Sequence, residues 1–356
     1  MNKPIVAIDF SSTGKGGGPY TSNRRVVESD LKEMYDFIPF IYKTEMGRFI
    51  SLRRINDIKK QLQKIKPDIV HFSGLGLMGF QIAIACKLAG IKNTVMTVHG
   101  FSSDALDISL IKRKIMSLLI EPLTIVMCKK VYGVSSFVAN RKLLKLFKKK
   151  NCGFIYNIPP LQKSNLANSL RNDLGINKND IIVASVGRIT KDKGYHILEE
   201  VISKFNGYKN LKFVIVGDGL YLNQMKRNLS EQIKQNQVFF LGYRSDVQQI
   251  LSDCNIFVLP TLHETLSIAL LEASTENLPL IASNTGGVPE IIKNGFNGIL
   301  VKPGSSSDLY NAILKLYGNR SICEIYGINA NLYIKEKFNV QSIISKIDSV
   351  YKTILG

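Results

Sequence analysis

Short apolar runs alternate with longer segments of helical periodicity along most of the chain. In the first half, each run predicts a strand, and the apolar residues of the segments between them recur at helical spacing. The predicted strands are 4–10, 37–42, 68–73, 93–100, 129–135 and 152–157, and the predicted helices include 52–66, 79–89 and 107–127. Strands that alternate with helices indicate βαβ units and a parallel sheet.

This alternation stops at a polar segment and then begins again. Residues 157–169, "NIPPLQKSNLANS", are rich in Pro, Asn and Ser and predict a linker. The second series has predicted strands 180–187, 211–219, 237–243, 255–260, 278–283 and 298–301, predicted helices 193–205, 220–235, 245–252, 266–276 and 288–293, and a helical tail 306–356. Two doubly wound halves are therefore expected. Ligands of open α/β sheets bind beyond the carboxyl ends of the strands, so a site is expected in the loops that follow the strands.

Composition narrows the class of protein. The 356 residues suggest two domains, and 45% hydrophobic with 21% charged residues is a globular composition. A net charge of +19 favours an anionic partner: nucleic acid, an anionic membrane surface or a phosphorylated ligand. The five cysteines are scattered and form no CxxC pair, which disfavours zinc and disulfides and fits a reducing cytoplasm. The first apolar run meets Asp9, as a strand does and a signal peptide does not.

The segment "ASVGRITKDKGYHIL" (184–198) places two cations at one strand end. Arg188 directly follows a predicted strand, and Lys193 begins the next predicted helix. Gly187 and Gly194 allow close approach of the backbone. Two fixed cations beside a helix N-terminus can hold a diphosphate without a metal ion. The alternative is a solvated loop with ordinary surface charges.

Two further strand ends are candidates for ligand contacts. The segment "SSTGKGGGPY" (11–20) resembles a phosphate-binding glycine loop, although Lys15 lacks a following Ser or Thr and Pro19 holds the last glycine position of GxGxxG. A Gly-rich loop without a ligand is the alternative. His71 and His99 each close a predicted strand and could bond a sugar hydroxyl or a phosphate, or could be ordinary satisfied polar groups.

Two glutamates flank a predicted helix start. Glu264 lies in the loop after strand 255–260, and Glu272 follows with seven residues between them. If the helix begins near Leu266, Glu272 lies about 9 Å along it, so the two carboxylates are expected to hold separate parts of one ligand. The helix N-terminus between them favours negative charge. A nucleotide-diphosphate sugar has that shape. The alternative is two unrelated surface acids.

Five motifs together resemble a known family. "GR…KG", "VGDG", "GYRSD", the E-x7-E pair and "GGVPE" occur in this order and at these spacings in the retaining glycosyltransferases of family 4, which have the GT-B fold. The resemblance implies an α/β protein with two Rossmann-like doubly wound domains facing across a cleft. It implies an acceptor domain over 1–160, a nucleotide-sugar donor domain over 170–337, and a C-terminal helix of about 338–356 that crosses back to the first domain.

The resemblance also implies roles for residues in the second half. Arg188 and Lys193 would hold the donor diphosphate and stabilise the leaving group in place of a metal ion. Glu272 would bind the ribose hydroxyls. Glu264, with the backbone amides of Leu266 and Ser267, would contact the donor sugar and its phosphate.

Further implied contacts come from both halves. The Gly16-Gly17-Gly18 loop would close over the diphosphate, and His99 would touch the transferred sugar. Gly187 would lie against the donor, and Tyr243 and Arg244 of "GYRSD" fall where the family holds the nucleobase. The glycine loop departs from many relatives because it runs on into "PYTSNR", where they have a histidine-bearing helix.

The positive charge is concentrated in the first half. Residues 108–150 contain eleven Lys or Arg and one acid, Glu121, with basic clusters at 112–114, 129–130 and 141–150. Leu143, Leu144, Leu146 and Phe147 interleave with the last cluster. Basic residues 112–150 therefore predict an amphipathic surface that could rest on anionic lipid. The alternative is a solvated basic face. No nucleic-acid-binding motif accompanies the charge, so a nucleic-acid partner is not expected.

The sequence therefore predicts a retaining, metal-independent glycosyltransferase of the hexosyltransferase type, without a cofactor. Its donor is expected to be a nucleotide-diphosphate sugar, with UDP favoured as the commoner donor of the family. The expected acceptor is a lipid-linked saccharide of bacterial surface polysaccharide or O-antigen synthesis, at the inner face of the cytoplasmic membrane. A UDP-sugar 2-epimerase of the same fold and a non-catalytic anion- or lipid-binding protein are the alternatives.

Overall fold

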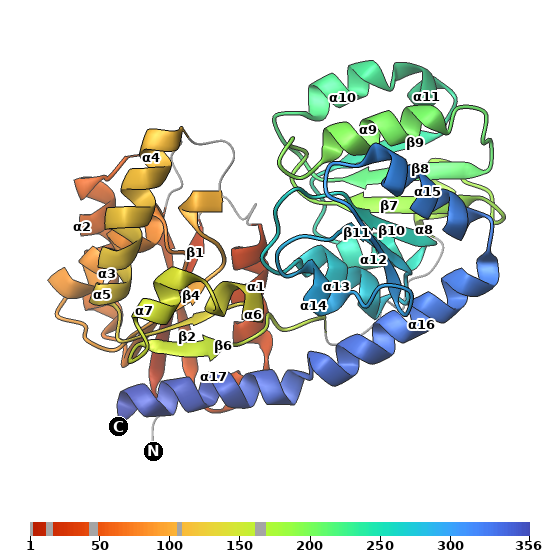
Figure 1. Cartoon of the computed structure of the whole chain (residues 1–356). Helices are drawn as coiled ribbons and strands as arrows, with labels where there is room; N and C mark the ends of the chain where they lie inside the picture. Colours follow the sequence, from red (N-terminus) through yellow and green to blue (C-terminus); the bar gives the residue numbers. More distant parts are fainter. Residues whose placement is uncertain (1–2, 12–16, 43–48, 105–108, 161–168) are drawn as a thin grey trace. The chain divides into compact units, whose positions relative to one another are not determined.

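The computed structural model describes residues 3–11, 17–42, 49–104, 109–160 and 169–356. The chain divides into two compact units (Figure 1). The first unit comprises the chain up to Ile158 together with Val340–Gly356, and the second comprises Pro159–Asn339. The boundary falls within the predicted linker, and the last helix belongs to the first unit.

The first unit is built on a six-stranded parallel sheet with the order β2-β1-β3-β4-β5-β6. Its strands are β1 (Ile5–Ser11), β2 (Asp36–Tyr42), β3 (Ile69–Ser73), β4 (Thr94–Val98), β5 (Lys130–Gly133) and β6 (Asn151–Phe154). Every position of β3 and β4 is buried. Such continuous apolar strands are expected where helices cover both faces of a sheet. The chain reverses its direction of travel across the sheet between β1 and β3, which makes this the topological switch point of the first unit.

The helices of the first unit are α1 (Gly18–Glu28), α2 (Leu52–Ile65), α3 (Leu77–Leu88), α4 (Leu110–Ile115), α5 (Glu121–Met127), α6 (Ser136–Ala139), α7 (Lys142–Leu146) and α17 (Val340–Leu355), with a π-helical turn over Met116–Ile120 and 3-10 turns at Asp30–Glu33 and Ser102–Asp104. Helix α2 shows how the sequence determines where a helix begins and which of its faces is buried. The Ser51 side chain accepts from the Arg54 amide as the N-cap, and Ile55, Ile58 and Leu62 form its buried stripe.

Two expectations for this unit need correction. The glycine loop does not run on through "PYTSNR", because α1 begins at Gly18 and contains that segment, with Pro19 in its first turn. Proline is tolerated there because the first-turn amide has no intrahelical acceptor. The predicted strand 152–157 ends at Phe154.

Helix α17 packs on the first unit through polar contacts as well as apolar ones. The Tyr351 hydroxyl lies 2.6 Å from His71 Nδ1, and Thr97 Oγ1 lies 2.7 Å from His71 Nε2. Burial lowers the pKa of His71 to about 3, so its ring is neutral. His71, considered above as a ligand contact, is therefore a satisfied buried group that anchors the C-terminal helix.

The second unit has its own six-stranded parallel sheet, with the order β12-β11-β10-β7-β8-β9. The strands are β7 (Ile181–Val186), β8 (Leu211–Val216), β9 (Val238–Gly242), β10 (Ile256–Leu259), β11 (Leu280–Ser283) and β12 (Gly298–Val301). In chain order this is the dinucleotide-binding Rossmann arrangement, and its switch point lies between β7 and β10.

The helices of the second unit pack in two sets, as a sheet covered on both faces requires (Figure 1). One set joins α9 to α10 and α15, and the other joins α13 to α12 and α16. The helices are α8 (Ser169–Leu174), α9 (Tyr195–Lys204), α10 (Leu222–Asn228), α11 (Ser230–Lys234), α12 (Val247–Ser252), α13 (Ile268–Thr275), α14 (Val288–Ile291), α15 (Ser306–Tyr317) and α16 (Arg320–Lys337). The core includes Phe205, Phe213 and Ile215.

Candidate active site

Two loops meet at the switch point of the second unit. One follows β7 and spans 187–194, and the other follows β10 and spans 260–267. The Lys193 amine donates to Glu264 Oε2 at 2.9 Å and lies 3.4 Å from the carbonyl oxygen of His263. The Lys193 side chain is only 20% exposed and that of Glu264 13%. The structure thus brings together two charged residues that belong to separate sequence motifs.

Glycines make this close approach of the loops feasible. Gly194 has φ +74°, and a Cβ there would lie 1.8 Å from the carbonyl oxygen of Pro260. Gly286 has φ +56°, and a Cβ there would lie 1.7 Å from the carbonyl oxygen of Glu264. The Gly287 amide donates to that same oxygen at 3.2 Å. The "KG" and "GGVPE" motifs therefore fix the backbone on both sides of the Lys193–Glu264 pair.

The "VGDG" motif supports the loop that carries Arg188. A Cβ on Gly217 would lie 1.9 Å from the carbonyl oxygen of Gly187. The Ile189 amide donates to the carbonyl oxygen of Asp218 at 2.9 Å. Gly187, predicted as a donor contact, therefore has an immediate structural role in packing the β7 loop against the β8 loop.

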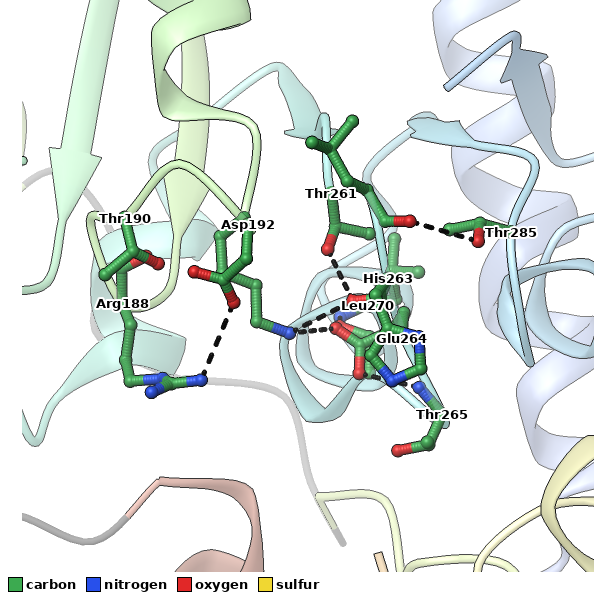
Figure 2. A network of polar contacts seen from close by, with 12 residues as sticks. Arg188, Thr190, Asp192, Thr261, His263, Glu264, Thr265, Leu270 and Thr285 are labelled. Carbon is green, nitrogen blue, oxygen red and sulfur yellow. Dashed lines mark hydrogen bonds and ion pairs between the residues drawn. The ribbon is translucent and has the colours of Figure 1, made fainter. Parts of the chain in front are cut away.

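Arg188 is placed differently from Lys193. Its guanidinium is 70% exposed, and its contact with Asp192 is long, at 3.8 Å (Figure 2). Ion pairs this exposed contribute little to stability, so the guanidinium can exchange Asp192 for another anion at small cost. The Lys193 ammonium has three N–H donors, and its two contacts leave one for a ligand oxygen. Both cations can thus reach an anion at this sheet edge.

The N-terminus of α13 lies in the same loop. The helix begins at Ile268, not near Leu266 as predicted, because Ser267 is the N-cap and its hydroxyl accepts from the Leu270 amide at 3.2 Å. Glu272 is therefore about 6 Å along the helix rather than about 9 Å, and it is half-buried. The first-turn amides of a helix carry partial positive charge and can bind a phosphate oxygen.

The nucleobase candidates lie farther along the sheet. Tyr243 and Arg244 follow β9, the edge strand, which is two strands from β7 and so about 10 Å away. The Arg244 guanidinium forms two hydrogen bonds with the Asp246 carboxylate, which raises the pKa of Arg244 and lowers that of Asp246. The structure does not bring these two residues to the Lys193–Glu264 pair.

The remaining predicted residues belong to the first unit. His99 follows β4, is half-buried, and has its pKa lowered to about 4 by desolvation, so the ring is neutral near pH 7. Gly17 and Gly18 form the N-cap and first residue of α1. Gly16 lies outside the described residues.

Sequence reasoning missed one polar residue at the switch point of the first unit. Asp9, near the end of β1, is buried. Its Oδ1 accepts from the Ser73 amide and the Asn23 side chain, both at 2.9 Å, and its Oδ2 accepts from the Tyr42 hydroxyl at 3.2 Å. Burial raises the pKa of Asp9 to about 7. A carboxylate inside an apolar strand, just before a glycine loop, was the available signal.

Within the part of the chain that the structure describes, no three His, Cys, Asp or Glu side chains gather as a metal centre would require. The groups at the second unit's switch point are the two cations Arg188 and Lys193, the carboxylate of Glu264 and the N-terminus of α13.

Two Rossmann-type units in one chain, with cations at the switch point of the second, are the architecture of the GT-B fold. Residues 17–157 match the family model described as Glycosyltransferase Family 4, and residues 167–333 match the model described as Glycosyl transferases group 1. The chain is therefore a glycosyltransferase and belongs to the family that combines these two domains.

Named relatives agree with this assignment over nearly the whole chain. The sequence is 29% identical to UDP-Gal:alpha-D-GlcNAc-diphosphoundecaprenol alpha-1,3-galactosyltransferase of Escherichia coli, covering 98% of this chain and 90% of that protein. It is 26% identical to the capsular polysaccharide biosynthesis glycosyltransferase CapM of Staphylococcus aureus, covering 93% and 90%. The fold is similar to that of Anabaena HepE, crystallised with UDP and glucose, with a TM-score of 0.78, 19% identity and coverage of 98% and 100%.

Proposed function

We propose that this glycosyltransferase moves a hexose from a UDP-sugar to a lipid-linked saccharide during synthesis of a bacterial surface polysaccharide. The observation that carries the proposal is the Lys193–Glu264 pair at the β7–β10 switch point, beside the N-terminus of α13. The names of the relatives supply the substrate class. The Escherichia coli enzyme uses UDP-Gal and a diphosphoundecaprenol-linked sugar, and the Anabaena structure holds UDP.

The donor diphosphate would lie between three sources of positive charge. Arg188 has an exposed guanidinium, Lys193 has one remaining N–H donor, and the amides of Leu266, Ser267 and the start of α13 lie in the loop after β10 that also carries Glu264. Charge-assisted hydrogen bonds to phosphate oxygens are about twice as strong as neutral ones. No metal ion is needed if these groups offset the charge of the leaving diphosphate.

Other predicted contacts complete the donor site in this proposal. Glu272, on α13, would accept hydrogen bonds from the ribose hydroxyls. Tyr243 would lie against the base, with Arg244 held aside by Asp246. In the first unit, Gly16, Gly17 and Gly18 would provide backbone contacts to the diphosphate, and the neutral His99 ring would exchange a hydrogen bond with a hydroxyl of the transferred sugar.

Transfer would retain the anomeric configuration. The bond between the sugar C1 and the diphosphate oxygen breaks, and the acceptor hydroxyl oxygen bonds to C1 on the same face. The acceptor proton passes to the departing diphosphate oxygen. Arg188 and Lys193 stabilise the negative charge that develops on that oxygen, which is where preorganised cations contribute most to a rate. Glu264 holds the Lys193 ammonium in position and forms no covalent intermediate.

A lipid-linked acceptor would place the enzyme at the cytoplasmic face of a membrane. None of the described helices is long and apolar enough to cross one. Attachment would therefore rest on a surface of the first unit, for which the sequence offered basic residues 112–150.

The first test is a thermal shift of the purified protein with UDP, GDP, ADP, CMP and several UDP-sugars, in EDTA. At a hundredfold excess over Kd, a ligand stabilises by about 2.7 kcal/mol, which raises the melting temperature of a unit this size by about 5–10 °C. We expect this shift with UDP and its loss in Glu272→Ala. Lys204→Ala is the matched control, because Lys204 forms an exposed ion pair with Glu200 away from the loops. No shift with any nucleotide would overturn the donor site.

Turnover is then measured with UDP-sugars and a lipid-diphosphate saccharide in EDTA. Product analysis by NMR gives the anomeric configuration. An α-linked product from an α-linked donor is expected. A β-linked product, or a requirement for a divalent cation, would contradict the mechanism. A UDP-sugar epimerised at C2 without any acceptor would instead establish the epimerase.

A further inference from the structure

An unusual apolar face lies on the helical segment that runs through α4, the π-helical turn and α5. Its large apolar side chains are between 49% and 73% exposed. The residues of this apolar face are Leu110, Ile111, Ile115, Leu118, Leu119, Leu123 and Val126. Exposed apolar residues are common singly, but so many on one helical segment mark a binding surface.

The π-helical turn keeps this face continuous. Met116 and Glu121 are both buried on the opposite side, although five residues separate them. Five residues of an α-helix rotate by about 140° beyond a full turn, which would place these two side chains on different faces. The Glu121 amide donates to the carbonyl oxygen of Met116 instead, five residues back, so the turn absorbs one extra residue. Ile115, Leu118 and Leu123 consequently stay in one stripe.

Positive charge borders the apolar face. Lys112 and Lys114 are exposed on either side of Ile111 and Ile115. The Lys112 ammonium lies 5.7 Å from the ring centre of Phe49, which is itself exposed. Phe49 therefore extends the apolar face toward α2. Residues 109–130 hold five Lys or Arg and one acid. That acid, Glu121, is buried and accepts from the Ser102 amide, so the charge that faces water is positive.

The sequence predicted the lipid-facing leucines elsewhere, and that expectation is wrong. In the basic run 141–150, Leu144 is fully buried, and Leu143 and Phe147 are half-buried. Helix α7 is only five residues long. Leu146 is exposed, but it has no apolar neighbour of similar exposure on that helix. The run contributes charge and not an apolar face.

We propose that the apolar face of α4–α5 docks into the headgroup boundary of an anionic bilayer, with Lys112 and Lys114 at the lipid phosphates. Amphipathic helices with an apolar stripe and basic flanks bind membranes in this manner, through buried apolar area and attraction to anionic lipid. The proposal rests on the proposed function, because a lipid-linked acceptor is what would require a surface of this kind.

Charge decides the occupant. Helix α16 also exposes three apolar residues, Ile325, Ile328 and Leu332. Acids accompany its cations, however, as in the Arg320–Glu324 ion pair and the sequence Lys335-Glu336-Lys337. The α4–α5 face has no exposed acid among its described residues. An anionic lipid surface therefore complements α4–α5 and not α16.

The test is flotation of the full chain with vesicles of phosphatidylcholine alone or mixed equally with phosphatidylglycerol. The variant is the triple substitution Ile111→Ser, Leu118→Ser, Leu123→Ser, and the matched control is Ile325→Ser, Ile328→Ser, Leu332→Ser. All six side chains are already exposed, so both variants should fold. We expect wild-type protein and control to float with the mixed vesicles. The apolar-face variant should lose about tenfold or more in partition coefficient.

Charge is tested separately. Lys112→Gln with Lys114→Gln should weaken flotation with the mixed vesicles by roughly thirtyfold, since each basic residue contributes about 1 kcal/mol near an anionic surface. Flotation with phosphatidylcholine alone should not change. Equal weakening on both vesicle types would contradict the assigned contact with lipid phosphates.

Other outcomes would overturn the proposal. Wild-type protein that does not float, or an apolar-face variant that floats as well as wild type, would do so. So would a wild-type dimer that the apolar-face variant converts to a monomer without any change in flotation, because the face would then bind a second copy. No donor or acceptor is present in these assays. A failure of sugar transfer is therefore separable from a failure of docking.

Discussion

Replacing Asp9 by Asn should stabilise the protein at neutral pH. It should also remove one contribution to the pH dependence of the free energy of unfolding. The Asp9 carboxyl is buried, and its described partners are the neutral groups of Ser73, Asn23 and Tyr42. Desolvation therefore outweighs these hydrogen bonds and raises the pKa of Asp9 from 3.8 to about 7. An asparagine has the same shape and no charge to desolvate.

The magnitude follows from the difference in proton binding. Between about pH 4 and pH 7 the folded state keeps a proton on Asp9 that the unfolded state has lost, so the free energy of unfolding falls as the pH rises. A gap of about 3 units at 1.36 kcal/mol each gives a loss of about 4 kcal/mol that is complete above pH 7. Below pH 4 both states are protonated, and the stabilising effect of the raised pKa is fully present.

Asn can reproduce most of the Asp9 contacts. Its oxygen can accept from the Ser73 amide and from Asn23, while its amide group takes the place of Oδ2 and donates to the Tyr42 oxygen. We allow about 1 kcal/mol for this rearranged hydrogen bond. The Asp9→Asn variant should therefore match or fall slightly below wild type at pH 4. It should exceed wild type by about 3 kcal/mol at pH 8.

Urea unfolding followed by circular dichroism at pH 4, 5, 6, 7 and 8 measures this difference. Because the chain has two units, the transition of the first unit is fitted separately. Asp180→Asn is the matched control: Asp180 is equally buried, but it lies in the second unit with Lys212 at 4.0 Å, so removing its charge should not stabilise. An Asp9→Asn variant that is less stable than wild type at pH 8 would refute the reasoning, because the anion would then be the favoured form.

Three further substitutions test the sites directly. Lys193→Ala should lower kcat/KM for transfer by roughly 10²–10³. It should also lower the free energy of unfolding by about 1–3 kcal/mol, because the largely buried carboxylate of Glu264 loses its cation. An unchanged kcat/KM would argue against the leaving-group role. Gly194→Ala adds a Cβ 1.8 Å from a carbonyl oxygen of the neighbouring loop at positive φ, so it should lower the melting temperature by several degrees, and a neutral result would disprove the close approach. Tyr351→Phe should lower the free energy of unfolding of the first unit by about 1–3 kcal/mol, because His71 Nδ1 stays buried without its hydrogen-bond partner. The amides of α17 should then exchange hydrogen faster, and unchanged exchange in α17 would contradict the prediction.

The central strands were predictable because buried parallel strands are mostly apolar runs, and β3, β4, β10 and β11 are buried at every position. Helix starts were less predictable, because they depend on caps. Leu266 belongs to the apolar pattern, yet the hydroxyl of Ser267 fixes the first turn. The start of α1 was missed because Gly17 and Gly18 give no periodicity.

The contact between Lys193 and Glu264 could not come from the sequence by itself. The two residues are 71 positions apart, and they meet only because β10 lies beside β7 in the sheet order. The apolar face of α4–α5 was hidden for another reason. Apart from Ser117, Glu121 and Thr124, the residues from 115 to 127 are apolar, so the pattern does not show which side of the helix faces water. The π-helical turn then shifts the helical register by one residue.

The two switch points of the chain differ in the charged groups that they carry. The one between β7 and β10 carries Arg188, Lys193 and a helix N-terminus, and a diphosphate gains energy from each. The one between β1 and β3 carries the buried carboxyl of Asp9, whose pKa burial raises to about 7, so this group is mostly uncharged below that pH. The same architecture thus presents cations in one unit and an acid in the other. This difference supports the proposal that the anionic donor binds the second unit and an uncharged acceptor hydroxyl approaches from the first.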